Sequence, residues 1–221
     1  MIISKLLVFL VLCTGISHHA KAAPIAILDE ALSTEELREL QGKLNRRTSL
    51  AVNFVQIRTS ALRPNRPSVS SGDAIFAKPA KFRWVIAKPQ AEMLIFDGVS
   101  IFSHKPGEKS ASRYKAEGGR AKEIKEIIDF VLDFDALLKR YNLENAVRSG
   151  QFITLKLTPK APNQVSNLVI KVDAKDSFVV AVNMNFQNKN SSEVQFSNPI
   201  AGKIDAKSFS IPDGVQIVDG F

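Results

Sequence analysis

Large apolar side chains fall on every second position in one short segment after another, and this period of two most constrains the fold. From Leu50, apolar residues recur through Val52 and Phe54 with Ala51 and Asn53 between them, as in a strand with one buried face. Similar segments predict further strands over residues 73–77, 81–87, 152–158, 167–173, 178–186 and 193–197, with 203–221 closing the chain.

Turn residues separate these segments and indicate antiparallel pairing. The segments 92–96 and 99–102 flank the dipeptide Asp97-Gly98, and Asp-Gly between two apolar runs favours a tight hairpin. The proline-rich segment 63–67 predicts a loop. A meander of short antiparallel strands is therefore expected.

A helix is predicted near the N-terminus. Residues 33–36 (Ser-Thr-Glu-Glu) fit a capping box, in which the Ser33 hydroxyl and the Glu36 carboxylate bond backbone amides that the first helical turn leaves unpaired. Leu32 and Leu37 stand at the two positions of a hydrophobic staple. One face of this helix then carries Leu37, Leu40 and Leu44.

Two further helices are predicted in the middle of the chain. Beyond Gly118-Gly119, charged residues alternate with an apolar stripe at helical spacing, formed by Ile124, Ile127, Ile128 and Val131. A third, short helix is expected through Leu137, Leu138 and Tyr141, with Asp135 as its N-cap.

These elements together predict a mainly β, α+β fold. Many antiparallel strands and a few amphipathic helices give one large curved sheet with helices on one face. The 221 residues, 45% hydrophobic and 24% charged, suit one globular domain. A long sheet tends to curl, and where helices cover its concave side, the space between can admit an apolar ligand.

The first 22 residues have the features of a secretory signal peptide. Lys5 precedes an apolar run over residues 6–12, and residues 20–22 (Ala-Lys-Ala) supply a small-residue cleavage site. We therefore expect residues 1–22 to be removed and residues 23–221 to form a single domain. Cys13 lies inside the apolar run behind the bulky Leu12, which argues against lipidation.

Cleavage changes the charge and the redox chemistry of the chain. Removing residues 1–22 takes away the one cysteine and two of the 30 basic residues but none of the 22 acidic ones, so the formal net charge falls from +8 to +6. An exported chain without cysteine fits a bacterial periplasm. A basic surface there favours anionic lipid headgroups or acidic proteins, or serves solubility alone. No basic run with interleaved aromatics indicates nucleic-acid binding.

The sequence offers little for catalysis or metal binding. His104 is the single histidine after cleavage and is expected to be solvated. No Gly-x-Ser-x-Gly elbow surrounds a serine, and Asp133 and Asp135 flank a helix junction, where capping is the commoner role. A structural zinc site that needs several thiolates is excluded. We therefore expect no enzyme activity, no cofactor and no metal.

Phenylalanine dominates the aromatic residues, with 14 Phe against one Trp and two Tyr. Rings without a hydroxyl or an indole N–H suit a wall that faces hydrocarbon. Phe is also ordinary core filler, so the composition is compatible with an apolar cavity without requiring one.

Six short motifs follow one another along the chain: 72–79 (GDAIFAKP), 81–84 (KFRW), 95–98 (IFDG), 155–160 (LKLTPK), 204–209 (IDAKSF) and 212–215 (PDGV). Together with Pro89 and the Ser191-Ser192 strand start, their order and spacing resemble the LolA family, the periplasmic carriers of outer-membrane lipoproteins. The resemblance covers nearly the whole chain after residue 22.

The resemblance implies a fold and a route for cargo. The fold is an incomplete antiparallel barrel with a helical lid over a hydrophobic cavity. In that family a monomeric carrier accepts lipoproteins from an inner-membrane ABC-type releasing complex, shields their acyl chains across the periplasm, and passes them to an outer-membrane acceptor lipoprotein.

Particular residues follow from the resemblance together with the strand and helix patterns. The expected lipid-binding cavity is lined by Val52, Phe54, Phe82, Trp84, Ile86, Leu94, Phe96, Phe102, Ile124, Ile127, Ile128 and Val131. The last four lie on a helix expected to cover the cavity mouth. Before Pro79 the family typically has an arginine that holds the lid closed, and here Lys78 stands at that position. Lysine lacks arginine's planar fork of hydrogen-bond donors, so we expect it to hold the lid less tightly.

Two other functions fit the same pattern. One is a carrier of a different lipid or glycolipid, because the same cavity would hold its chains. The other is a lipid-sensing regulatory protein built on the same half-barrel. The sequence identifies neither the cargo nor the handover partners.

Overall fold

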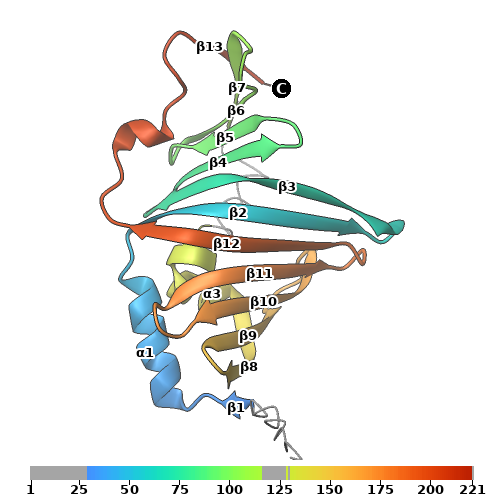
Figure 1. The fold of residues 1–221 in the computed structure, drawn as a ribbon, viewed down its shortest axis with the longest axis vertical. Helices are drawn as coiled ribbons and strands as arrows, with labels where there is room; N and C mark the ends of the chain where they lie inside the picture. Colours follow the sequence, from blue (N-terminus) through green and yellow to red (C-terminus); the bar gives the residue numbers. More distant parts are fainter. Residues whose placement is uncertain (1–28, 116–127, 129, 221) are drawn as a thin grey trace, which may run out of the picture.

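The computed structural model describes residues 29–115, 128 and 130–220, and one large sheet dominates it (Figure 1). Its strands are β1 (Glu30–Ala31), β2 (Ser49–Ser60), β3 (Arg63–Ala77), β4 (Lys81–Lys88), β5 (Glu92–Phe96), β6 (Ser100–His104), β7 (Ser110–Lys115), β8 (Tyr141–Ser149), β9 (Phe152–Pro159), β10 (Val165–Asp173), β11 (Phe178–Phe186), β12 (Ser191–Ala201) and β13 (Gln216–Asp219). The expected signal peptide lies outside the described residues.

The strands form a single open sheet. Their order across it is β1-β8-β9-β10-β11-β12-β2-β3-β4-β5-β6-β7-β13. Neighbouring strands are antiparallel, except that β7 and β13 run parallel. Because β1 and β13 stand at opposite ends of this order, the sheet curves without closing, and the predicted incomplete antiparallel barrel is confirmed.

Three helices have defined bounds: α1 (Thr34–Asn45), α3 (Phe134–Arg140) and the 3₁₀ helix η1 (Ala206–Phe209). Ile128 and residues 130–132 are also helical. No helix in the described ranges is long and apolar enough to cross a membrane.

The pleat of the sheet separates two apolar clusters on opposite faces. The main cluster joins the buried side chains of β2, β3, β4 and β9–β12 with those of α1 and α3, and we call this side the inner face. The second cluster combines Met93, Ile95 and Phe102 on the outer face of β5 and β6 with Phe209 of η1. Helices therefore cover the inner face, and the C-terminal segment covers the outer face at β5 and β6.

The start of α1 confirms the predicted capping box. The Glu36 amide donates to Ser33 Oγ at 3.3 Å, and the Ser33 amide donates to Glu36 Oε2 at 2.9 Å. Leu40 and Leu44 are buried in the main cluster, and Leu37 packs against it. The leucine face of α1 thus covers the inner face of the sheet, as its spacing predicts.

The hairpin between β5 and β6 is also confirmed. Asp97 Oδ1 accepts hydrogen bonds from the amides of Val99 at 2.8 Å and Ser100 at 2.7 Å. Gly98 has a φ of +105°, a backbone conformation that glycine adopts without the strain a Cβ would add. The turn chemistry of two residues therefore fixes this part of the meander.

The prediction of a loop at residues 63–67 is wrong, because this segment begins the long strand β3. β3 pairs with β2 at Arg63 and again from Ser68 onward, with a register shift between these points. Pro64 and Pro67 lie in the unpaired stretch between these points, where no backbone N–H is needed for strand pairing. A strand tolerates proline at such positions.

Two predictions about polar residues are also wrong. Asp133, rather than Asp135, caps α3, because its Oδ1 accepts from the Ala136 amide at 3.0 Å; the helix ends at Arg140, and β8 follows directly. His104 is only 5% exposed rather than solvated. Its Nδ1 lies 3.2 Å from the Ser110 carbonyl oxygen, so the ring is satisfied between β6 and β7.

Gly72 allows a bulge where β3 meets β4. The register of the two strands shifts between Ser71 and Gly72. Their backbones approach so closely there that a Cβ on Gly72 would lie 1.8 Å from the Val85 carbonyl oxygen. Only glycine fits this position without displacing β4.

We predict that Gly72→Ala lowers the free energy of unfolding by about 1–3 kcal/mol, because the added methyl must push a neighbouring backbone aside. Urea unfolding measures the change. Gly42→Ala is the matched control, since a Cβ on this α1 residue would meet only the mobile end of Arg46 at 4.0 Å. The control should be neutral or stabilising by about 0.5–1 kcal/mol. Equal stability of the two variants would contradict the bulge argument.

Candidate functional site

An apolar cavity of about 100 Å³ lies between the inner face of the sheet and the helical residues Phe130 and Val131. Its walls come from β2, β4, β5, β11 and β12. The lining residues are Gln56, Arg58, Phe82, Trp84, Leu94, Phe130, Val131, Val182, Met184, Val194 and Phe196. Only Gln56 and Arg58 among them are polar, so hydrocarbon is the ligand chemistry that fits this space.

Packed aromatic rings form the floor of the cavity: Phe82, Trp84 and Phe196 line it, and Phe54 packs against Trp84. Phe54 and Trp84 stack with centroids 3.7 Å apart, although β3 separates their strands. The β3 residues opposite them in the register are Gly72 and Ala74, which are small enough to let the two rings meet above β3. Two more rings contact Trp84, those of Phe82 and Phe196.

The inner face of β2 changes from apolar to polar toward the tip of the β2–β3 hairpin. Residues 50, 52 and 54 are at most 4% exposed. The next inner-face residue, Gln56, is still buried and donates from Nε2 to Ser192 Oγ at 3.0 Å. Arg58 follows and is exposed. The cavity therefore has an apolar end beneath the helices and a polar end toward the hairpin tip.

Most of the predicted cavity residues lie together. Seven are buried in the main cluster: Val52, Phe54, Phe82, Trp84, Phe96, Ile128 and Val131. Ile86 and Leu94 pack against that cluster. Among these nine, the residues that line the cavity itself are Phe82, Trp84, Leu94 and Val131. Ile124 and Ile127 lie outside the described residues.

Phe102 is placed in the second cluster on the outer face, which corrects its assignment to the cavity. In the β5–β6 hairpin Phe102 pairs with Ile95, and Ile101 pairs with Phe96. Adjacent residues of a strand point to opposite faces. Ile101, and not Phe102, therefore shares the inner face with Phe96.

Sequence reasoning missed five apolar residues of the lining: Phe130, Val182, Met184, Val194 and Phe196. The last four lie on β11 and β12, which were predicted as strands. Val182 pairs with Val194, and Phe196 pairs with Phe54. The alternation within residues 178–186 and 193–197 indicates which side chains share a face, but only the pairing with β2 identifies that face as the inner one.

Lys78 links the end of β3 to the junction of α1 and α3. Its Nζ donates to the carbonyl of Asn45, the last residue of α1, at 2.9 Å. Asn45 Oδ1 in turn accepts from the amide of Phe134, the first residue of α3, at 2.8 Å. The Lys78 amide also donates to the Thr48 carbonyl at 2.8 Å. Lys78 thus holds the C-terminal end of α1, and its role as a lid tether stays a prediction.

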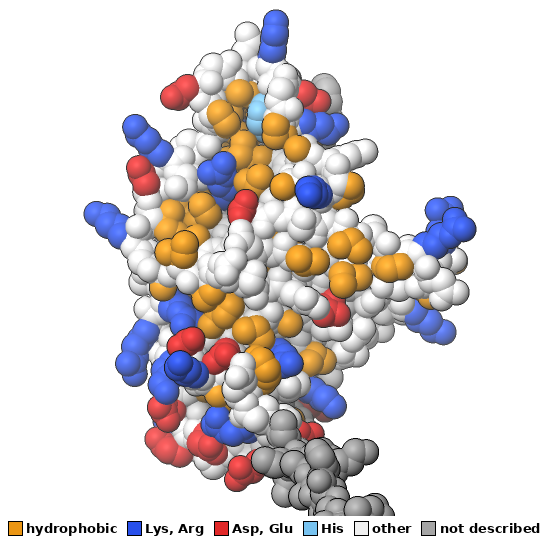
Figure 2. All heavy atoms as spheres, viewed as in Figure 1, with side chains coloured by type: hydrophobic (Ala, Val, Ile, Leu, Met, Phe, Trp, Pro, Cys, Tyr) orange, Lys and Arg blue, Asp and Glu red, His pale blue; other side chains and the backbone are white. Residues whose placement is uncertain are grey.

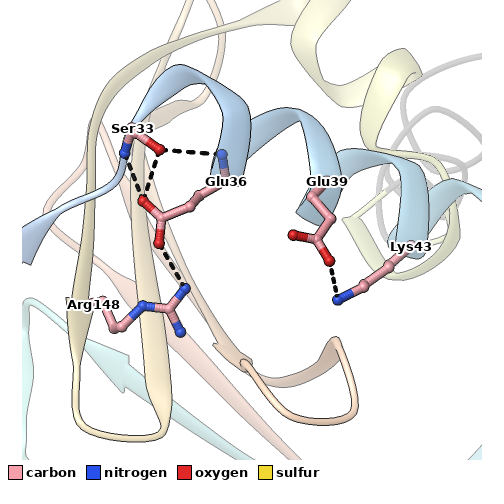
Figure 3. A network of polar contacts seen from close by, with 5 residues as sticks. All are labelled: Ser33, Glu36, Glu39, Lys43 and Arg148. Atoms are coloured by element: carbon pink, nitrogen blue, oxygen red, sulfur yellow. Dashed lines mark hydrogen bonds and ion pairs between the residues drawn. The ribbon is translucent and has the colours of Figure 1, made fainter.

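The other end of α1 is fastened to β8 (Figure 3). Arg148 Nη2 donates to Glu36 Oε1 at 3.2 Å, while Glu36 Oε2 accepts from Ser33. The hydrogen bonds from the Ser33 backbone and side chain, followed by those of Arg148, lower the pKa of the Glu36 carboxyl. Figure 3 also draws the Glu39–Lys43 pair of α1, in which both side chains are exposed.

The two helices also bond to each other. Gln41 Nε2 of α1 donates to Asp135 Oδ1 of α3. This bond is the main cause that lowers the pKa of the Asp135 carboxyl, and the charges of Lys139 and Lys78 add to the effect. The helices are thus held over the inner face by their apolar sides and by a few polar contacts at their ends.

Ionisable side chains do not gather into a metal site in the described residues. No group of three or more His, Cys, Asp or Glu side chains there is arranged to hold a metal ion. His104 and Asp133 instead have the structural partners given above.

Comparison with known proteins yields a family match over most of the chain. The family model described as outer membrane lipoprotein carrier protein LolA matches residues 45–212. An outer-membrane lipoprotein carrier protein of Vibrio campbellii is 26% identical over 192 residues, which are 85% of this chain and 89% of the relative. Another, from Chromobacterium violaceum, is 23% identical over 202 residues, 90% and 95% of the two chains.

Among solved structures, an uncharacterized conserved protein from Thermus thermophilus superposes with a TM-score of 0.53 and 11% sequence identity. The match covers 83% of this chain and 99% of the other. At this identity the likeness concerns the fold alone.

We predict that Lys78→Leu speeds hydrogen exchange of the α1 amides by at least about tenfold, because losing a hydrogen bond from a charged donor costs about 1.5–3 kcal/mol. Lys78→Arg should keep the slow exchange, since it preserves a charged donor. Lys43→Leu is the control, because it removes an exposed pair within α1 and should have little effect. Unchanged exchange in Lys78→Leu would show that Lys78 does not stabilise α1 against opening.

A second prediction concerns pH. The lowered pKa of Asp135 means that its contribution to stability is full above the ordinary carboxyl pKa of 3.8 and is lost as the pH falls through the folded-state pKa. Asp135→Asn should therefore melt at a lower temperature than the parent protein at neutral pH. The difference should shrink below a pH of about 3.8. Melting curves from pH 7 to pH 2 test this, and a difference that does not depend on pH would refute it.

Proposed function

Because the chain belongs to the LolA family, we propose that it carries lipoproteins by enclosing their acyl chains in the apolar cavity lined by Phe82, Trp84 and Phe196. The observation that carries the proposal is this cavity, whose walls are apolar except at one end. Each methylene that leaves water for such a space gains about 0.8 kcal/mol. A cargo with several acyl chains would otherwise stay in a membrane or aggregate.

Carriage requires the cover to move. Pockets for ligands of drug size measure about 300–1,000 Å³, whereas this cavity holds about 100 Å³. Acyl chains would therefore displace the helical segment that contains Ile128 and Val131, which we propose as the lid together with Ile124 and Ile127. The contacts of Lys78 and Asp135 lie at the ends of α1 and α3, so they can break while the strand pairing persists.

The proposal extends to the location and the route. Residues 1–22 would direct export and be removed, which leaves residues 23–221 as a monomeric carrier in the periplasm of a Gram-negative bacterium. The carrier would load at an inner-membrane ABC-type lipoprotein-releasing complex and unload at an outer-membrane acceptor lipoprotein. It would act by binding alone, without enzyme activity, cofactor or nucleic acid.

Extraction of the purified protein tests the proposal directly. The chain is expressed with its export signal, purified from the periplasm without detergent, and extracted with organic solvent for mass spectrometry. Triacylated lipoprotein in the extract is the expected result. A different lipid would indicate a carrier of that lipid instead, and the absence of any acylated molecule would contradict carriage and favour a regulatory protein.

We further predict that Val194→Phe weakens acyl-chain binding at least about tenfold, because its ring fills the cavity that Val194 lines. The probe is dibromostearic acid, whose bromine atoms quench Trp84, the single tryptophan of the chain. Val55→Phe is the matched control, because Val55 lies on the opposite face of neighbouring β2 and is 39% exposed. Equal affinities of the two folded variants would exclude this cavity as the acyl site.

A further inference from the structure

A second, larger pocket of about 600 Å³ adjoins the apolar cavity at its polar end. The two spaces share four lining residues: Gln56, Arg58, Phe130 and Met184. The second pocket then continues along the hairpin toward Arg63 and Arg66 and across to the β11–β12 turn. One ligand could therefore occupy both spaces, with its apolar part inward and its polar part toward the hairpin tip.

The charge of this second pocket has one sign. Among the residues that the structure describes, Arg58, Arg63 and Arg66 line it, and no Asp or Glu does. Within the described part of the chain, none of the three guanidinium groups forms an ion pair. Figure 2 shows Lys and Arg side chains gathered at the projecting end of the β2–β3 hairpin. The hairpin thus presents positive charge that no acidic side chain of the described residues neutralises through an ion pair.

The remaining walls supply neutral hydrogen-bonding groups. Hydroxyls of Ser60, Ser68 and Ser191 and the amide of Asn188 line the same pocket. Arginine combines a permanent charge with several donors in one plane, which suits the oxygens of a phosphate group. Hydroxyl and amide side chains can add further donors to the same group.

The two turns that frame the second pocket are bonded together. The Ala61 amide at the tip of the β2–β3 hairpin donates to Asn190 Oδ1 in the β11–β12 turn at 2.9 Å. The Asn190 amide donates to Asn188 Oδ1 at 3.1 Å. The strands behind these turns pair through Thr59 and Ser191. The arginines on β2 and β3 are therefore carried by a framework that spans both walls.

Building on the proposed function, we propose that the second pocket binds the phosphate-bearing headgroup of an anionic amphiphile whose acyl chain occupies the apolar cavity. Phe54 and Arg58 lie four residues apart on one face of β2, which places them about 13 Å from each other along the strand. A chain that reaches the aromatic floor would thus leave its headgroup beside the arginines. The cargo or its surrounding lipid would be selected by charge as well as by hydrocarbon.

Quenching of Trp84 by two brominated amphiphiles tests this inference. Lysophosphatidylglycerol and monoacylglycerol carry the same dibromostearoyl chain, and only the first has a phosphate. The protein should bind the phosphate-bearing probe at least about fivefold more tightly at low salt, as expected when more than one exposed charge contributes. Added salt should reduce this preference, because the arginines are exposed.

Variants test whether the preference for the phosphate-bearing probe depends on the arginines of the β2–β3 hairpin. In Arg63→Gln/Arg66→Gln the ratio of the two affinities should fall toward one. The control Lys105→Gln/Lys109→Gln removes the same charge at the exposed turn between β6 and β7 and should keep the ratio of the parent protein. An unchanged ratio in the arginine variant, or an equal fall in both variants, would overturn the headgroup pocket.

The outcomes also separate this inference from the carrier function. Equal quenching by both probes would leave carriage intact and overturn the headgroup pocket, whereas no quenching by either would overturn both. Calorimetry with inorganic phosphate distinguishes the two sources of a phosphate group. Much weaker binding of free phosphate than of lysophosphatidylglycerol supports a lipid headgroup, and comparable binding would assign the pocket to free phosphate instead.

Discussion

An open sheet with one strongly apolar face must keep that face from water, and the way this protein does so determines the rest of its structure. The outer face of β5 and β6 is covered by η1 through Phe209, and the inner face is covered by α1, α3 and the helical residues around Val131. A second sheet packed on the inner face would have filled this side with interdigitating side chains. Helices of limited length leave a space instead, and the aromatic rings of Phe82, Trp84 and Phe196 border it.

The contacts that fasten this cover differ in kind from those that hold the sheet. Strand pairing is continuous across the sheet, whereas α1 depends on its leucine face and on polar contacts near its two ends, through Glu36 to Arg148 and through Asn45 to Lys78. A cover held in this way can lose its polar bonds without loss of strand pairing. The apolar surface that opening exposes would be re-covered by acyl chains, so binding and opening would be coupled.

The inner face of a single strand runs from an apolar environment to a polar one. On β2 the inner-face residues proceed from Phe54 through the buried Gln56 to the exposed Arg58. Since β2 is central and long, its neighbours β3 and β12 continue the same change with Ser68 and Ser192. An amphiphile has the same order of apolar and polar parts, which is the physical basis of the proposed selection by headgroup charge.

The sequence by itself determined the features that depend on neighbouring residues, including the capping box at Ser33, the Asp97-Gly98 turn, most strand segments and the motifs of the family. The tertiary structure alone decided which face each strand buries and which distant strands meet. It placed Phe102 on the outer face, buried His104, extended β3 through Pro64, and brought Val194 and Phe196 to the cavity. Alternation reveals that side chains share a face, but a shift of one residue exchanges the two faces, and only long-range pairing fixes that register.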